Sequence, residues 1–244
     1  MELTEQLSFS HDDRRDLYEY VEEHGTVHER EARRALNMDP TAFGHHATVL
    51  VRDGYLTWED DRLSVAYEEE DTSDHETNGF TYTVRMAAQR DLGGLVGAIR
   101  EVAEEGTYIE AETVADIIEH DEVVLRHNEL GSRLFFVAAV DDDVIGWVHL
   151  ELPEAEKLSH TAVLTVGLLP EYRGKGIGST LLARGESWAA DNGFEKLYNS
   201  VPATNADAVE FLVAHGWERE AVRERHYKID GEYVDELMLA KRID

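Results

Sequence analysis

The residues with the clearest chemical potential lie in one short stretch, PEYRGKGIGSTLLARGESWA, which begins at Pro170. Gly174, Gly176 and Gly178 alternate with other residues there, and an apolar pattern of helical period follows without a break. Glycine weakens the first turn of a helix, so its repeated use indicates that bare backbone is required. A strand that turns into a helix in this way directs free N–H groups and the positive end of the helix dipole at one point. The stretch therefore predicts a cradle for phosphate or pyrophosphate oxygens.

Two cations support this interpretation, because Arg173 and Lys175 can add charge-assisted contacts to an anion. The spacing matches neither the dinucleotide pattern G-x-G-x-x-G nor the nucleotide loop G-x-x-x-x-G-K-[ST]. Residues 173–178 instead fit the pattern R/Q-x-x-G-x-G after an apolar strand. A turn that is rich in glycine for structural reasons alone is the less favoured alternative.

The elements that must position this loop follow from the periodicity of apolar residues after residue 80. We expect a strand, two helices and three strands, then the loop and its helix, a strand, a helix and two closing strands. Tight hairpin turns are predicted at 141–143 and at Asp230-Gly231. The segment HTAVLTVGLL before the loop is mostly apolar, which predicts a central strand.

The loop motif and this order of elements resemble the GNAT superfamily of N-acetyltransferases. The segment NADAVEFLVAHGW at 205–217 is similar to that family's second motif, in which an Asn precedes a short helix, a Gly and an aromatic residue. The resemblance covers residues 80–244 and implies an α/β (α+β) fold with a mixed, mostly antiparallel sheet flanked by helices. It also implies an N-acetyltransferase that uses acetyl-CoA as co-substrate and no metal.

The resemblance implies a set of coenzyme-binding residues. The end of the strand before the loop would bind the pantetheine arm through its backbone, the loop would hold the pyrophosphate, and the second motif would line the far side. The corresponding residues of this chain are Leu168, Leu169, Arg173, Gly174, Lys175, Gly176, Gly178, Ser179, Asn205 and Phe211. Asn205 also stands where a helix N-cap is expected, and the two roles are compatible.

The implied reaction is direct attack of a neutral primary amine on the thioester in a ternary complex. Because an alkylammonium must first lose a proton, a base or a chain of waters is needed. Our candidate catalytic residues are Glu151 or His149, which alternate on one strand and share a face, with His160 behind them. For each of the three, a solvated side chain at a strand edge is the alternative. The family's usual tyrosine, which protonates the leaving thiolate, falls at Leu212, so the general acid stays open.

Because Leu212 replaces the family's usual tyrosine, we also consider a second function. A regulator that binds acetyl-CoA as a signal, with little or no catalysis, would need the same loop and would not need the tyrosine. Turnover with a panel of amines would separate the two hypotheses.

The first part of the chain divides into a helical unit at 1–68 and an acidic linker at 69–79. Three short helices followed by a hairpin about Asp60-Asp61 resemble a winged helix-turn-helix domain. Its acids outnumber its bases, which disfavours DNA binding and favours protein contact or homodimerisation. His45 and His46 have no third ligand in view, so we expect no metal site there.

The chain of 244 residues carries 52 acidic and 23 basic residues, for a net charge of −29. Its 42% hydrophobic content is too high for a disordered acidic chain, so we expect a folded protein with an acid-coated surface, typical of a salt-loaded cytoplasm. There is no cysteine, which excludes disulfides and a cysteine nucleophile. The sequence shows no membrane-spanning run and no signal peptide, so we expect a cytoplasmic protein.

Overall fold

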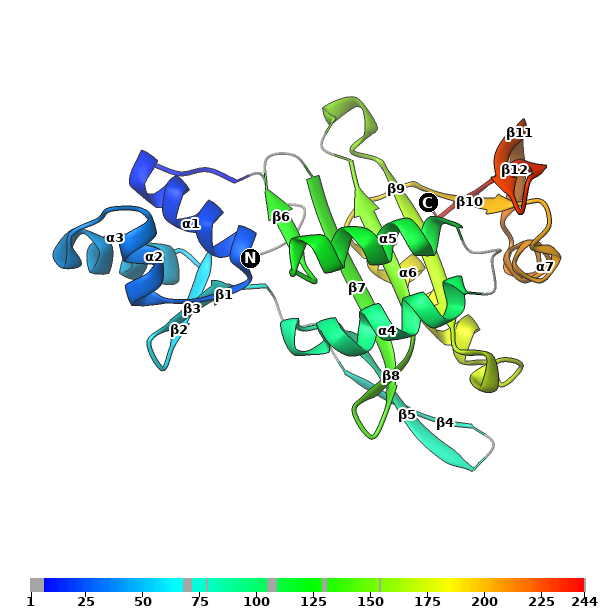
Figure 1. Ribbon diagram of the computed structural model, residues 1–244, viewed down its shortest axis with the longest axis horizontal. Helices are drawn as coiled ribbons and strands as arrows, with labels where there is room; N and C mark the ends of the chain where they lie inside the picture. Colours follow the sequence, from blue (N-terminus) through cyan, green and yellow to red (C-terminus); the bar gives the residue numbers. More distant parts are fainter. Residues whose placement is uncertain are drawn as a thin grey trace.

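The computed structural model describes residues 7–67, 72–77, 79–104, 109–128, 131–153 and 155–243. Within these ranges the chain forms a small N-terminal unit and a larger unit built on one long sheet (Figure 1). None of the helices that the structure describes combines the length and the apolar character needed to cross a membrane.

The N-terminal unit combines three helices with a three-stranded antiparallel sheet in the order β1-β3-β2. Its elements are α1 (Asp12–His24), β1 (Thr26–His28), α2 (Glu29–Ala35), α3 (Pro40–Arg52), β2 (Leu56–Glu59) and β3 (Arg62–Val65). Local signals set the helix boundaries: Asp39 accepts hydrogen bonds from the first amides of α3, and Pro40 opens that helix. Leu17, Phe43 and Leu63 belong to a separate apolar core between these elements.

The larger unit contains a nine-stranded sheet in the order β11-β12-β10-β9-β8-β7-β5-β4, with β6 paired to β7 outside this path. Its strands are β4 (Ser73–Thr77), β5 (Phe80–Met86), β6 (Arg126–Asn128), β7 (Gly131–Val140), β8 (Asp143–Leu152), β9 (Thr161–Leu168), β10 (Lys196–Pro202), β11 (Glu218–Ile229) and β12 (Glu232–Arg242). Every pair is antiparallel except β9 with β10. The expected mixed, mostly antiparallel sheet is confirmed.

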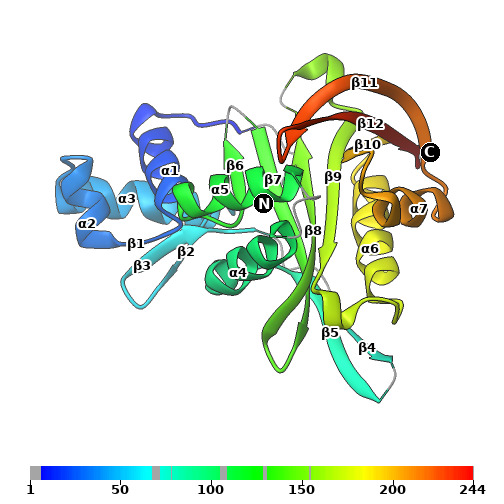
Figure 2. The ribbon, with the colours of Figure 1, turned by 45° about the vertical axis from the view of Figure 1, so that its right-hand side comes forward.

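Helices cover both faces of this sheet, α4 and α5 on one side and α6 on the other (Figures 1 and 2). The α-helices are α4 (Leu92–Ala103), α5 (Ile109–Asp121), α6 (Ile177–Asp191) and α7 (Ala206–Ala214), and the short 3₁₀ helices are η1 (Gln89–Asp91), η2 (Glu156–Leu158) and η3 (Pro170–Tyr172). The order of elements expected from the sequence is confirmed except at β6, a short fourth strand before the loop that the sequence did not predict. β9 lies centrally between β8 and β10.

Three hairpins turn on residues in the left-handed conformation, as the sequence predicted. The turns are Asp60-Asp61, Asp141-Asp142 and Asp230-Gly231, and all six residues have positive φ angles. Aspartate and glycine tolerate this conformation better than most residues, and paired positive φ angles match the twist of the flanking strands.

The predicted linker at 69–79 is wrong in part, because residues 73–77 form β4, an edge strand paired with β5. Its sequence SDHET is polar, since an edge strand needs few apolar side chains, and for that reason it has the composition of a linker. Residues 68–71 and 78 lie outside the described residues.

The two units meet where α1 lies against β6. The Tyr18 hydroxyl donates a hydrogen bond to the carbonyl of His127 at 2.8 Å. Glu22 is 3% exposed and accepts from the Arg126 guanidinium at 3.0 Å and from the His127 amide at 3.1 Å. A buried carboxylate with several donors fixes this junction more firmly than an exposed ion pair would.

Candidate active site

A cavity of about 300 Å³ opens between the ends of β9 and β10, at the mouth of α6. Backbone and side chains from both strands, the glycine-rich loop, α5 and α7 surround it. Its lining residues are Ile109, Ala111, Trp147, Thr165, Val166, Gly167, Leu168, Arg173, Gly174, Gly176, Gly178, Ser179, Asn199, Ser200, Val201, Pro202, Asn205, Asp207, Ala208, Phe211 and Leu212.

The cavity exists because two parallel strands separate. β9 and β10 are paired only along 161–163 and 196–198. At the point of separation, the Asn199 side-chain amide donates to the Leu164 carbonyl at 2.6 Å, in place of the next ladder bond. Beyond it, residues 165–168 of β9 and 199–202 of β10 line opposite sides of the cavity. The gap therefore exposes strand edges that an extended ligand can pair with.

The glycine-rich loop closes one end of this cavity with bare backbone. Gly174 and Gly176 have φ angles of +71° and +86°, a region that other residues rarely adopt. A methyl group added to either would meet no atom within 4 Å. Gly176 is also the N-cap of α6 and supplies no side-chain cap, so the first amides of the helix stay available. The open space before these amides is what an anion-binding cradle needs.

Gly178 differs from these two glycines in its conformation and surroundings. It lies inside the first turn of α6, and a methyl group there would make ordinary contact with the Phe211 ring at 3.6 Å. Phe211 comes from α7, and its ring lines the cavity beside this first turn. The position leaves room for alanine as far as the protein is concerned, so a requirement for glycine would come from a ligand.

The two cationic side chains of the loop, Arg173 and Lys175, point to different places. Arg173 lines the cavity, and its Nε donates to the Leu168 carbonyl at 3.0 Å. Lys175 does not line it: its Nζ donates to the Glu171 carbonyl at 2.6 Å and stands over the rings of Phe80 and Tyr172 at 5.5 and 5.3 Å. These contacts hold the ammonium on the β5 side of the loop, away from the predicted pyrophosphate position.

Leu169 also lies outside the cavity lining, although Leu168 belongs to it. The Leu169 amide donates to the Ile145 carbonyl at 2.9 Å, and its side chain packs against the main core. Its backbone donor is therefore already used within the sheet, which leaves residues 165–168 as the part of β9 at the cavity.

The hairpin of β4 and β5 supports the loop from outside. The Thr77 hydroxyl donates to the Lys175 carbonyl at 2.9 Å. The Tyr82 and Thr180 hydroxyls lie 3.0 Å apart. The strand with the composition of a linker thus helps to fix the backbone of the cradle.

Ser179 and Asn205, two of the predicted coenzyme-binding residues, line the cavity. The Ser179 hydroxyl lies 2.9 Å from Nε2 of His215, whose Nδ1 lies 2.7 Å from the Phe211 carbonyl. Because a carbonyl only accepts, Nδ1 of neutral His215 carries the proton and Nε2 accepts from the serine. Asn205 is the N-cap of α7, with its side-chain oxygen accepting from the Ala208 amide at 3.1 Å. The predicted cap is confirmed, and the same residue faces the cavity.

None of the three predicted catalytic residues lines the cavity. His149 is 2% exposed and stacks on Phe135, with Nδ1 3.3 Å from the Thr165 hydroxyl. Burial, aided by the positive charge of Arg133, lowers its pKa to about 3. Its imidazole is therefore neutral at physiological pH and is a weak base.

The other two candidates are exposed. Glu151 is exposed on β8, and in register its neighbours are Arg133 and Val163, where β9 and β10 are still paired. His160 precedes β9, at the end of the strand remote from the cavity. At about 3.3 Å per residue, it is roughly 16 Å from Thr165, the nearest cavity-lining residue of that strand. The alternation of side chains along a strand predicted which face of the sheet these residues share. It did not predict how far they lie from the glycine-rich loop.

Sequence reasoning missed Trp147, Thr165 and Asn199, which also line the cavity. A Cβ at Gly167 would overlap the six-membered ring of Trp147, so the indole lies flat against bare backbone there. A glycine within an apolar strand was the one available signal, because such a residue often marks a close approach. Asn199 carried no such signal, since its role depends on where two strands separate.

The larger unit is similar in sequence to known acetyltransferases. The acetyltransferase (GNAT) family model matches residues 99–217, a range that includes the loop, Asn205 and Phe211. An N-alpha-acetyltransferase of Saccharolobus solfataricus is 31% identical over 118 residues, which cover 44% of this chain and 68% of that protein. The L-amino acid N-acetyltransferase AaaT of Escherichia coli is 26% identical over 107 residues, covering 43% of this chain and 65% of AaaT.

In each of these comparisons, the matched region covers only a part of this chain and a part of the relative. The chain spans only 55% of the length of a further relative, the Drosophila melanogaster protein san, with 28% identity over 106 residues. The N-terminal unit lies outside the family match.

Solved structures share the fold. The Salmonella typhimurium protein yncA, solved with its cofactor acetyl-CoA, superposes with a TM-score of 0.54 over 67% of this chain and 94% of its own, at 18% identity. A ribosomal-protein-alanine N-acetyltransferase from Brucella melitensis gives 0.53 over 65% and 98%, at 23% identity. Since the strands, the loop and the helix that form the cavity all lie within the matched region, the chain belongs to the GNAT family of acetyltransferases.

Proposed function

We propose that this chain transfers an acetyl group from acetyl-CoA to a primary amine, by direct attack in a ternary complex. The observation that carries the proposal is the cavity itself. It joins an anion cradle of bare glycine backbone to a gap between two separated strands. A coenzyme with a diphosphate at one end and an extended, hydrogen-bonding arm at the other has this shape and chemistry.

The residues present fit such a ligand. Gly174, Gly176 and the first amides of α6 would hold the diphosphate, with Arg173 adding charge. The edge of β9 at 166–168 would pair with the arm, and Phe211 would cover its far side. The coenzyme, when bound, supplies an activated acyl thioester. Trp147, Thr165 and Asn199 would shape the space around the acyl end.

Few side chains at the cavity could accept a proton from the amine or donate one to the leaving thiolate. Among the described residues that line the cavity, the only ionisable side chains are Arg173 and Asp207, and the position of the family's usual tyrosine is the buried Leu212. We infer that the amine loses its proton to solvent rather than to Glu151, His149 or His160. The rate should then follow the fraction of free amine as the pH rises through the pKa of the acceptor.

The same observation favours a second candidate function, an acetyl-CoA sensor with little catalysis. Binding would use the cradle in full, while the missing tyrosine would leave turnover slow. Calorimetry with acetyl-CoA in concentrated KCl tests the part common to both functions. Release of free coenzyme A with an amine panel then separates them, since a sensor would bind without releasing it. Absence of binding would contradict both.

The amines in that panel should represent the different chemical classes of acetyl acceptor. The names of two relatives refer to an α-amino group and to L-amino acids. We therefore propose that L-amino acids and peptides with free N-termini be tested beside lysine side chains and polyamines. An acid-coated surface attracts cations in general, so it does not choose between them.

We propose that the N-terminal unit is a winged-helix-like module for protein contact or homodimerisation. Its three helices and small sheet occur in the order that such a domain requires. The acidic composition disfavours DNA as its partner. A cytoplasm rich in salt is the location that the composition favours. Sedimentation of the full chain, with and without duplex DNA, tests the choice of partner.

A further inference from the structure

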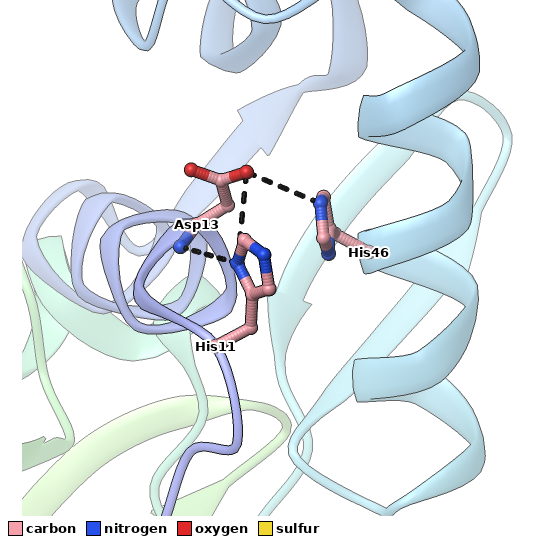
Figure 3. Close-up of side chains that lie close together, drawn as sticks. All are labelled: His11, Asp13 and His46. Carbon is pink, nitrogen blue, oxygen red and sulfur yellow. Dashed lines mark hydrogen bonds and ion pairs between the residues drawn. The ribbon is translucent and has the colours of Figure 1, made fainter.

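Three potential metal ligands from distant parts of the sequence meet at the start of α1 (Figure 3). Oδ2 of Asp13 lies 3.3 Å from Nε2 of His46 and 3.6 Å from Nδ1 of His11. The imidazole rings of His11 and His46 have centroids 4.9 Å apart. One ligand atom from each residue lies within 4.8 Å of the other two.

The local structure explains why these side chains converge. His11 is the N-cap of α1, and its Nδ1 accepts from the Asp13 amide at 3.2 Å. Asp13 lies in the first turn of that helix, and His46 lies in the middle of α3. Since α1 packs against α3 in the N-terminal core, the side chain of His46 points at the carboxylate (Figure 3).

Burial divides the cluster into an anchored side and an open side. His46 is 8% exposed, and its Nδ1 has no hydrogen-bond partner among the described residues, so Asp13 is the ring's one ion-pairing contact there. The side chains of His11 and Asp13 are each about half exposed. An ion can therefore reach the cluster from solvent, and a water can complete its coordination.

The donor set selects a class of ion. Ligand atoms at 2.0–2.1 Å from a tetrahedral zinc ion are roughly 3.3 Å from one another. The two Asp13 distances are already close to that value. Because Nδ1 of His11 accepts from the Asp13 amide, the exposed His11 ring would give up that cap hydrogen bond to the ion or turn its Nε2 toward it. Two imidazoles with one carboxylate suit zinc, cobalt, nickel or copper, whereas magnesium and calcium prefer oxygen ligands alone. The net charge of −29 adds an attraction for any cation.

We propose that His11, Asp13 and His46 bind one divalent transition-metal ion, zinc or a close relative, and that this ion fastens the start of α1 to α3. The site belongs to the N-terminal unit and is independent of acetyl transfer. The sequence pointed away from it, because the pair His45-His46 showed no third ligand nearby. His11 and Asp13 become neighbours of His46 only when the helices pack.

The test uses the full chain without a histidine tag, stripped with a chelator and held in concentrated KCl. Titration with Co²⁺ should give visible absorption bands of a site with imidazole ligands, saturating at one ion per chain. Zn²⁺ should abolish the bands, and millimolar Mg²⁺ should not. Loss of the bands on adding Mg²⁺, or a failure to saturate, would indicate cations held by the acidic surface and would overturn the proposal.

Variants locate the site. His11→Ala and Asp13→Asn alter exposed ligands and should each weaken Co²⁺ binding by at least about tenfold. His45→Ala, an exposed neighbour on α3, is the matched control and should bind as the parent does. In parallel, Zn²⁺ should raise the unfolding midpoint of the parent and of His45→Ala, but not of His11→Ala. Equal loss of binding in the His45 variant, or none in the other two, would contradict the assignment.

Discussion

Gly176 lies in the glycine-rich loop and Gly178 in the first turn of α6, and substitution of the two should have different effects. Gly176 has a φ angle of +86°, whereas Gly178 is helical and has room for a methyl group beside Phe211. Gly178→Ala should therefore fold normally and bind acetyl-CoA at least about tenfold more weakly, because a methyl group would stand between the ligand and the amides of α6. Calorimetry and thermal unfolding measure the two effects.

Gly93→Ala is the matched control for that prediction, since Gly93 lies in α4 and a methyl group added there would meet no atom within 4 Å. It should gain about 0.5–1 kcal/mol of stability and leave coenzyme binding unchanged. Gly176→Ala should lose about 1–2 kcal/mol through its left-handed backbone as well as binding. Undiminished binding by Gly178→Ala would remove that residue from the cradle.

His149 gives a prediction about pH. Its pKa of about 3 lies far below the ordinary value of 6.5, so between these values the unfolded chain binds a proton that the folded chain does not. The free energy of unfolding should therefore fall as the pH drops below 6.5, by roughly 1.4 kcal/mol per pH unit from this residue. Acid-sensitive carboxylates add to the total, so the contribution must be isolated with a variant.

His149→Gln removes the titrating ring and serves that purpose. Urea unfolding in fixed KCl at pH 7.5 and pH 5 should show the stability gap between parent and variant narrowing by about 2 kcal/mol at the lower pH. A gap of the same size at both pH values would mean that His149 titrates normally in the folded protein.

At the scale of elements, the separation of β9 from β10 decides where a ligand can lie. Asn199 bridges the two strands at that point through its bond to the Leu164 carbonyl. Asn199→Leu leaves a buried carbonyl without its donor and should cost about 1–3 kcal/mol of stability. It should also weaken acetyl-CoA binding, because the edges of the gap lose their spacing.

Asn192 offers a matched comparison, since its side chain donates to the Trp188 carbonyl at 2.8 Å at the far end of α6. Asn192→Leu should lose some stability and retain coenzyme affinity. If both variants bind acetyl-CoA equally well, the bridge at Asn199 is structural only. Hydrogen exchange along 165–168 and 199–202 would show the loosening directly.

At the scale of the whole molecule, Glu22 joins the two units. It accepts from Arg126 and from the backbone of β6, so Glu22→Ala would leave these donors without their acceptor. We expect a loss of about 3 kcal/mol in urea unfolding and faster proteolysis between the units, moderated by the second partner of Arg126, Asp121. Glu23→Ala, an exposed neighbour, should change stability by less than about 0.5 kcal/mol.

The net charge of −29 acts on the molecule as a whole. Repulsion between exposed acids opposes the compact state and is screened over about 10 Å at 0.1 M salt and about 3 Å at 1 M. The unfolding midpoint should therefore rise as KCl increases from about 0.1 to about 2 M. A flat or falling midpoint in calorimetric scans would argue against adaptation to a salt-rich cytoplasm.

The sequence by itself determined most of the order of elements, the three tight turns and the glycine-rich turn into α6. Each depends on interactions between residues close together in the chain: the periodicity of apolar side chains, the φ angles that Asp and Gly accept, and the start of one helix. It failed at β4, where a polar edge strand has the composition of a linker, and at β6, a strand of three residues.

Only the tertiary structure decided which side chains share a space. It turned Lys175 toward Phe80 and away from the cavity, and it left Glu151 and His160 outside. It also brought His11 and Asp13 to His46 across two packed helices. Distances of this kind depend on strand register, on where strands separate and on how helices pack, and these follow from contacts between residues far apart in the sequence.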